Sequence, residues 1–162
     1  MTITTGDRLP EATLLRIGDD GPEGVALSEL TAGKTVVLFG LPGAFTGTCT
    51  TAHVPSFIRT KDAFAEKGVV DIICFAVNDP HVMKAWAEAT GAEAAGLHML
   101  GDSDGALTKA LGLDFDAPAA GFHGRTTRCA MLVEDGTVKV LHLEQGRGIC
   151  EATAGEAMLA EV

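Results

Sequence analysis

Residues Thr35–Cys49, of sequence TVVLFGLPGAFTGTC, decide how the rest of this chain is interpreted. The first five, TVVLF, are apolar and rich in β-branched side chains, which is typical of a buried strand. A glycine-rich turn follows, and the segment after Cys49, TTAHVPSFI, has the apolar spacing of a helix. A lone cysteine therefore stands where a turn leaves a strand and opens a helix. There the free N–H groups and the positive end of the helix dipole favour a thiolate, which predicts a nucleophile.

The composition predicts one folded domain that spans residues 1–162. A hydrophobic fraction of 46% with 21% charged residues is ordinary for a folded soluble protein, and 162 residues suffice for a substantial core. The net charge of −10 argues against nucleic-acid binding, because phosphate contacts need a concentrated basic surface. No stretch approaches the roughly 20 apolar residues of a membrane-spanning helix, and the N-terminus lacks the features of a secretory signal. We therefore expect a cytoplasmic protein that binds neither nucleic acid nor membrane.

Strands and helices are expected to alternate along the chain. Residues 11–17 and 25–30 form short leading segments, and the helix that opens at Cys49 is expected to end at Gly68. The other expected elements are strands at 69–77 and 97–100, helices at 80–90 and 104–111, a hairpin of 128–134 with 137–143, and a helical tail within 151–162. This order predicts a thioredoxin-like α/β fold, with a central mixed β-sheet flanked by helices.

The spacing of the cysteines and histidines gives no sign of a metal site. The four cysteines lie far apart, with no C-x-x-C pair, and the five histidines show no ligand spacing, so no metal or other cofactor is expected. A phosphate-binding loop is disfavoured, since no Lys-Ser/Thr pair follows the glycines of the turn.

The pattern Pro42-x-x-x-Thr46-x-x-Cys49 resembles the active-site motif of the peroxiredoxins. The similarity extends over most of the chain in the family's order. The longer matches, which resemble the peroxiredoxin 5 (type II) subfamily, are PGAFT at 42–46 with His53 and Pro55 downstream, VNDP at 77–80, VMKAW at 82–86, and Arg128-x-Ala130-Met131 before EDG at 134–136. The resemblance implies a thiol-dependent peroxidase that reduces hydrogen peroxide and small organic hydroperoxides.

The resemblance also implies a role for each residue of the site. Cys49, as a thiolate, attacks one peroxide oxygen and becomes a sulfenic acid. Arg128 places a permanent positive charge beside the sulfur, which favours the thiolate and the developing anion. Thr46 hydrogen-bonds the peroxide, Pro42 shields the cysteine from water, and the turn at Gly43 supplies a backbone donor.

Two further residues carry open alternatives. His53 lies four residues after Cys49, on the same helical face, where it would tune the thiolate, line the pocket or make a structural hydrogen bond. Arg125 competes with Arg128 for the place beside the sulfur, and the strand that follows Arg128 favours Arg128.

Three routes are open for reducing the sulfenic acid. Cys74 occupies the second strand, at a position where some plant-like type II members carry a resolving thiol, although a disulfide with Cys49 would require local unwinding of the helix. Cys150 lies near the C-terminal region where mammalian-type members place theirs. Without a resolving thiol, glutathione, with or without glutaredoxin, would act directly; thioredoxin is the other expected reductant. Cys129 is interpreted as packing. The family commonly forms homodimers through the face with the active-site loops, and we expect the same here.

Two other functions would use the same fold or the same thiol. A thioredoxin-type disulfide oxidoreductase needs a second cysteine close to the first, and Thr46 stands in that place. A redox sensor or holdase would use the same reactive Cys49, but it would turn over peroxide slowly with any thiol donor.

Overall fold

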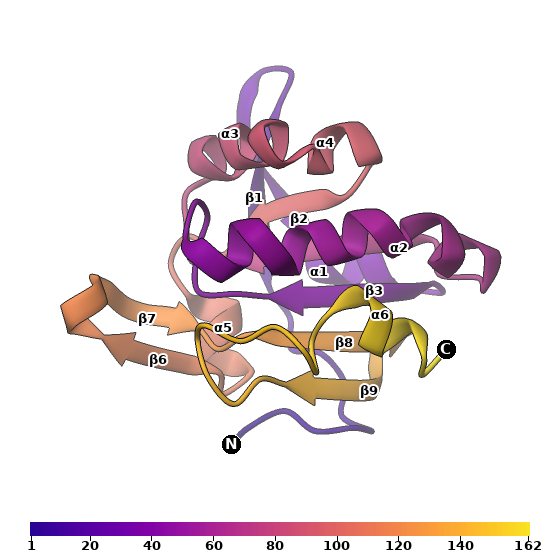
Figure 1. Cartoon of the computed structure of the whole chain (residues 1–162). Coiled ribbons are helices and arrows are strands. Elements are labelled where there is room, and N and C mark those ends of the chain that lie inside the picture. Colours follow the sequence, from indigo (N-terminus) through magenta and orange to yellow (C-terminus); the bar gives the residue numbers. More distant parts are fainter.

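The computed structural model describes residues 1–162, which fold around a seven-stranded mixed β-sheet (Figure 1). The strands of this sheet are β1 (Thr13–Gly18), β2 (Gly21–Ala26), β3 (Thr35–Gly40), β4 (Asp71–Ala76), β5 (His98–Gly101), β8 (Cys129–Glu134) and β9 (Thr137–Leu143). They are ordered β2-β1-β5-β4-β3-β8-β9. Strands β3, β4 and β5 pair in parallel, whereas β1, β2, β8 and β9 pair antiparallel with their neighbours. The expected thioredoxin-like sheet is confirmed.

Helices cover both faces of the sheet. The longest of them, α2 and α3, lie on the same face (Figure 1). The helices are α1 (Leu27–Thr31), α2 (Val54–Glu66), α3 (Pro80–Thr90), α4 (Ala92–Ala95), α5 (Ala106–Ala110) and α6 (Gly155–Leu159), with a π-helical turn, η1 (Cys49–His53), directly before α2. No helix is long and apolar enough to cross a bilayer.

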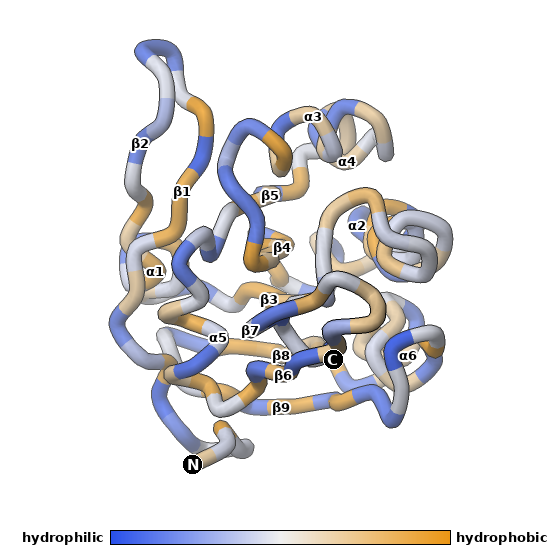
Figure 2. The backbone as a smooth tube through the Cα atoms, turned by 90° about the vertical axis from the view of Figure 1, so that its left-hand side faces the viewer, coloured by the Kyte–Doolittle hydropathy of each residue, from blue (hydrophilic) through white to orange (hydrophobic).

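The apolar run of β3 contributes side chains to the hydrophobic clusters on both faces of the sheet. Its neighbours β4 and β8 pair with it on both sides, so its alternate side chains enter opposite faces of the sheet. Val37 and Phe39 pack under α2 and α3, whereas Val36 and Leu38 pack with α1 and α5 on the other face. Figure 2 shows mostly hydrophobic residues in these central strands and a hydrophilic tip on the β1–β2 hairpin. Because β3 is paired on both sides and buried on both faces, its end at Gly40 holds the start of the following turn in a fixed position.

Most expected elements are confirmed within a few residues of their predicted bounds. Helix α3 and the β8–β9 hairpin match closely, and α2 ends just before Gly68, whose φ of +88° stops a helix. Two hairpins were not predicted. In the first, β1 pairs with β2, so the expected segment 25–30 is divided between the end of β2 and α1. In the second, β6 (Asp114–Ala117) pairs antiparallel with β7 (Phe122–Thr126), around the 3₁₀ turn Pro118–Ala120. Its strands have only four and five residues, and they contain Asp114, Asp116 and Gly124, residue types that strands disfavour, so the short alternation there was not recognised as a strand. It projects beside the active-site turn and contributes to the pocket (Figure 1).

Candidate active site

Cys49 lies at the first residue of η1, where the turn from β3 meets the long helix, and its side chain is 1% exposed. The turn is π-helical because Val54 N–H reaches back five residues, to Cys49 O, and because Pro55 has no N–H with which to continue an α-helical ladder. The turn places Cys49 in the buried cluster between α2 and the sheet. This is the strand–turn–helix arrangement that the sequence predicted.

Arg128 lies against the sulfur of Cys49. Its Nη2 donates to Cys49 Sγ at 3.2 Å and to Arg147 O at 2.9 Å, and its Nη1 contacts His53 Nδ1 at 3.0 Å. Arg128 is only 3% exposed, so its charge acts on Cys49 with little screening from water. Arg125 lies elsewhere, since its Nη1 donates to Pro42 O at 2.9 Å. Of the two arginines, the structure brings Arg128 to the sulfur.

The hydrogen bonds of His53 define its protonation state. A guanidinium can only donate, so Nδ1 accepts from Arg128, and Nε2 carries the proton and donates to Thr153 O at 3.0 Å. Burial above all, and the nearby charge of Arg128, lower the pKa of His53 to about 3, although the hydrogen bond to Thr153 opposes this shift. Of the three alternatives for His53, the structure favours a structural hydrogen bond: His53 is fully buried, it contacts the guanidinium of Arg128, and it is not among the residues that line the pocket.

Acidification is expected to destabilise the fold through His53. The imidazole has a reference pKa of 6.5, whereas in the folded protein its pKa is about 3. Between these values the unfolded state binds more protons, so the contribution of His53 is complete above pH 6.5 and is lost as the pH falls towards 3. At pH 5 the loss is about 2 kcal/mol. Denaturant titrations at pH 7 and pH 5 should show a smaller acid loss for His53→Gln than for the wild type. Equal losses would contradict this account.

The turn around Gly43 fixes the orientation of Thr46. Thr46 Oγ1 donates to Gly43 O at 2.7 Å, so its hydroxyl oxygen is left to accept a hydrogen bond from a peroxide O–H. Asn78 Oδ1, from the loop after β4, accepts from Ala44 N–H at 2.9 Å and fixes the same turn. A side chain at position 43 would collide with the guanidinium of Arg125. A larger residue at this position would displace the end of the Arg125 side chain from its hydrogen bond to Pro42 O.

A pocket of about 310 Å³ lies at the end of β3. It brings together Pro42, Thr46 and Arg128, which the sequence had assigned to the site. Gly43 lies just behind this wall, where its carbonyl holds Thr46. Phe122 of the β6–β7 hairpin and Arg147 also line the pocket, and sequence reasoning missed both. A prediction of the hairpin would have been needed to find Phe122.

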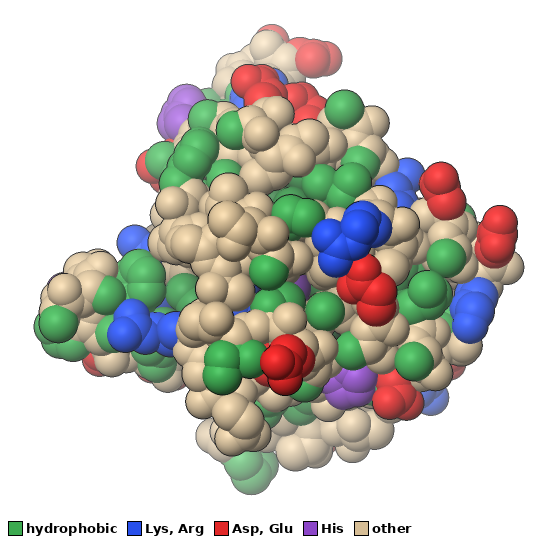
Figure 3. Space-filling model, viewed as in Figure 1, with side chains coloured by type: hydrophobic (Ala, Val, Ile, Leu, Met, Phe, Trp, Pro, Cys, Tyr) green, Lys and Arg blue, Asp and Glu red, His purple; other side chains and the backbone are tan.

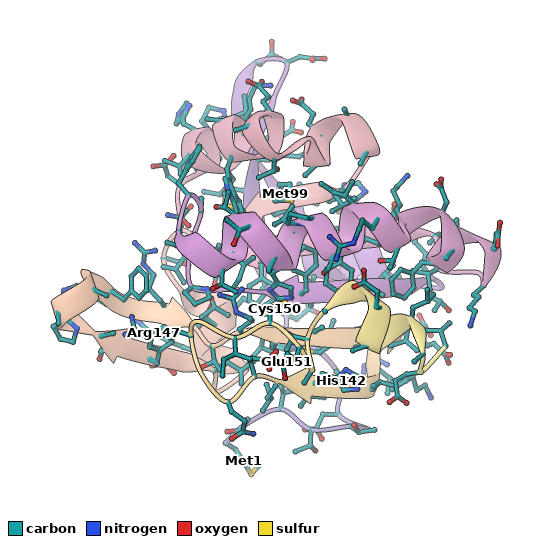
Figure 4. All side chains as sticks on the ribbon, viewed as in Figure 1. Met1, Met99, His142, Arg147, Cys150 and Glu151 are labelled. Carbon is teal, nitrogen blue, oxygen red and sulfur yellow. The ribbon has the colours of Figure 1, made fainter.

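The C-terminal segment 144–153 holds this arrangement from outside. The Glu144 carboxylate accepts three hydrogen bonds from the backbone N–H groups of 151–153 and a fourth from Thr153 Oγ1 at 2.7 Å. Burial opposes the ionised carboxylate, but these hydrogen bonds prevail and lower the pKa of Glu144. The closed loop presents two carbonyls to the site, that of Arg147 to Arg128 and that of Thr153 to His53. Figure 4 shows Arg147, Cys150 and Glu151 following one another along this segment.

The other three cysteines are free thiols in different surroundings. Cys74 is fully buried in β4, and its burial raises the pKa of the thiol well above the ordinary value. Cys129 is also fully buried, at the start of β8, with a pKa raised by burial to about 12. Cys150 is half-buried in the 144–153 segment, where burial again raises its pKa and its Sγ lies 3.8 Å from Thr153 Oγ1.

Comparisons with known proteins agree with this geometry. The family model described as Redoxin matches residues 4–158. The chain is 43% identical to chloroplastic peroxiredoxin-2E-2 of Oryza sativa subsp. japonica, over 98% of this chain and 72% of that protein. It is 42% identical to peroxiredoxin-2C of the same organism, over 98% of each. Among solved structures it resembles reduced Prx3 of Vibrio vulnificus in complex with H2O2, with a TM-score of 0.91 and 44% identity over 99% of each chain. The chain therefore belongs to the peroxiredoxins, the thiol-dependent peroxidases that act through a reactive cysteine.

Proposed function

We propose that Cys49 is the cysteine that attacks the peroxide, and that Arg128 stabilises both its thiolate and the transition state. The observation that carries this proposal is the contact of Arg128 Nη2 with Cys49 Sγ at 3.2 Å, inside a buried site. The sulfur lone pair attacks the nearer peroxide oxygen, and the O–O bond breaks. The product at the enzyme is a sulfenic acid, and the departing oxygen takes a proton to leave as water or an alcohol. Negative charge that grows on the departing oxygen is stabilised by the fixed guanidinium.

Thr46, Pro42 and Gly43 orient the substrate in this proposal. Because Thr46 donates to Gly43 O, its oxygen accepts from the peroxide O–H and holds that same oxygen beside the sulfur that attacks it, so that the other oxygen departs. Pro42 is buried, its carbonyl is held by Arg125, and its ring limits access of water to Cys49. Gly43 acts through its carbonyl, which holds Thr46, since the N–H of the next residue, Ala44, already donates to Asn78. A loss of selectivity for peroxide over alkylating reagents in Thr46→Val would support the role of Thr46.

The substrates follow from the motif resemblance and the pocket. Hydrogen peroxide and small organic hydroperoxides are the proposed oxidants, for a type II peroxiredoxin that acts as a single domain in the cytoplasm. Glutathione, glutaredoxin and thioredoxin are the proposed reductants. Peroxide consumption assayed with each reductant in turn tests this proposal. Slow turnover with every donor would favour a sensor or holdase instead.

Of the two candidate resolving cysteines, Cys150 is the better placed. Cys74 lies within β4, whose neighbours β3 and β5 would have to release their hydrogen bonds before it could move. Cys150 lies in a segment without regular secondary structure, and two carbonyls of this segment hold the Arg128–His53 pair beside Cys49. Opening this segment requires that the Glu144 contacts and the two carbonyl hydrogen bonds to Arg128 and His53 break, but no strand has to leave the sheet. We therefore expect a Cys49–Cys150 disulfide to precede any Cys49–Cys74 disulfide.

Peptide mass spectrometry under non-reducing conditions, after one equivalent of hydrogen peroxide, tests this order. The expected product is a peptide pair that joins Cys49 to Cys150, and it should disappear in Cys150→Ser but persist in Cys74→Ser. A pair with Cys74 would contradict the expectation. A sulfenic acid that persists with no disulfide would assign the reduction to an external thiol such as glutathione.

We propose a homodimer that associates through the face with the active-site loops. Two large apolar side chains are exposed there: Phe45 is 57% exposed, with a φ of +61°, and Ile149 is 43% exposed. Phe45 belongs to the turn before Cys49 and Ile149 to the 144–153 segment, so both flank the pocket. Sedimentation that detects only a 16.7 kDa species at micromolar concentration would exclude this dimer. A dimer that dissociates in Phe45→Glu would support it.

A further inference from the structure

Positive charge gathers around Phe122 at the mouth of the pocket. The guanidinium carbon of Arg125 lies 5.3 Å from the centre of the Phe122 ring, and that of Arg147 lies 5.5 Å from it. Arg128 lies deeper in the same pocket, against Cys49. None of these arginines forms an ion pair, although the chain has a net charge of −10. Figure 3 shows Lys and Arg side chains where the β6–β7 hairpin meets the rest of the molecule.

No acidic side chain lines this pocket. One carboxylate, that of Glu144, borders the cavity on the other side of Arg147, but it already accepts four hydrogen bonds from 151–153. The hairpin's Asp116 also has a partner, since its Oδ1 accepts from Gly124 N–H at 2.7 Å. The charge of the arginines is therefore available to a ligand. An anion held by a guanidinium in a partly desolvated site interacts more strongly than it would in bulk water.

The pocket is larger than hydrogen peroxide requires. Its volume is about 310 Å³, whereas a water molecule takes roughly 30 Å³ of liquid. The Phe122 ring lines the pocket and lies under the guanidinium of Arg147, so it offers an apolar surface next to that charge. Arg147 itself is exposed, so its guanidinium can turn towards a ligand, while its carbonyl stays bound to Arg128. The shape and the charge together fit a short organic chain with an anionic end.

We propose that Arg147, assisted by Arg125, binds a carboxylate on the substrate, so that this peroxidase prefers short hydroperoxides that carry a carboxylate over neutral ones. This inference rests on the proposed role of Cys49. In the complex the hydroperoxide group lies at Cys49, between Thr46 and Arg128, and the carboxylate lies against Arg147. The sulfur takes the nearer peroxide oxygen, the O–O bond breaks, and the remaining alkoxide takes a proton. The organic product is the corresponding hydroxy acid.

The test compares a short hydroperoxide that ends in a carboxylate with its methyl ester. The rate of Cys49 oxidation is measured in a single turnover without reductant, from the loss of free Cys49 thiol in rapidly quenched samples. At low ionic strength the acid should react about three- to tenfold faster than the ester, and added salt should reduce this ratio. The ratio should fall to about one in Arg147→Gln and below one in Arg147→Glu. Arg16→Gln, which removes one positive charge from β1, near the opposite edge of the sheet from β8, should keep the wild-type ratio.

Three results would overturn the assignment. The first is equal rates for acid and ester in the wild type, and the second is a preference for the acid that survives in Arg147→Gln. The third is a preference that is confined to the reduction step, so that oxidised Cys49 reacts faster with glutathione than with a thiol that lacks carboxylates. The arginines would then bind the reductant and not the peroxide. Hydrogen peroxide is the separate check, because its failure to oxidise wild-type Cys49 would refute the proposed function itself.

Discussion

Replacement of Cys49 by serine is expected to abolish peroxide consumption, with a fall of at least about 10³-fold in the rate. A serine hydroxyl is not ionised at neutral pH and cannot form a sulfenic acid, so the contact with Arg128 would have no thiolate to stabilise. Steady-state peroxide consumption with an excess of reductant measures the effect. Cys49 is almost completely buried, but serine is close to cysteine in size and fits the same space. The variant should therefore stay folded.

Cys129→Ser provides the matched control for this substitution. Cys129 is as buried as Cys49, but burial raises its pKa to about 12, and it packs on the other face of the sheet. Its replacement should leave most of the peroxidase activity in place. Substantial activity in Cys49→Ser, or loss of activity in Cys129→Ser with the fold intact, would show that Cys49 is not the reacting sulfur.

Arg128→Gln is expected to have the second largest effect, a fall of about 10²- to 10³-fold in the rate of Cys49 oxidation. The substitution removes the charge beside the sulfur and the donor that the transition state needs. Alkylation of Cys49 by iodoacetamide at neutral pH reports the reactivity of the sulfur separately from peroxide cleavage, and it should be slower in the variant. Stopped-flow oxidation by hydrogen peroxide measures the rate.

Arg128→Lys separates charge from geometry. A lysine keeps the positive charge but cannot replace the planar guanidinium, which contacts Cys49, His53 and the Arg147 carbonyl at once. We expect an oxidation rate between those of wild type and Arg128→Gln. Rates for Arg128→Gln within threefold of wild type would show that the contact at 3.2 Å has no catalytic part.

The regular core of the fold was predictable because its signals are local. The run TVVLF predicted β3, Asp135-Gly136 predicted the β8–β9 hairpin, and Gly68 marked the end of α2. These residues encode burial, turn conformation and helix termination in a few neighbouring positions. The β6–β7 hairpin was missed because its strands are short and contain Asp and Gly, which strands disfavour, and this hairpin brings Phe122 to the pocket.

The site was predictable only where a motif supplied long-range information. Arg128 lies 79 positions from Cys49, and no local pattern in the sequence joins them; the family resemblance did. The neutral state of His53 could not be predicted, because it depends on burial and on a carbonyl 100 positions away. The closure of 144–153 by Glu144 was equally invisible, since a carboxylate that binds backbone N–H groups resembles any surface glutamate in sequence. Packing and hydrogen bonding, rather than residue type, define these roles.

The most direct test of the central claim is to trap the sulfenic acid. Cys150→Ser protein, which lacks the favoured resolving thiol, is treated with one equivalent of hydrogen peroxide in the presence of dimedone and then mapped by peptide mass spectrometry. The account predicts a single adduct on Cys49, and none on Cys74 or Cys129. An adduct on either of those cysteines, or an unmodified Cys49 after the peroxide is consumed, would contradict it.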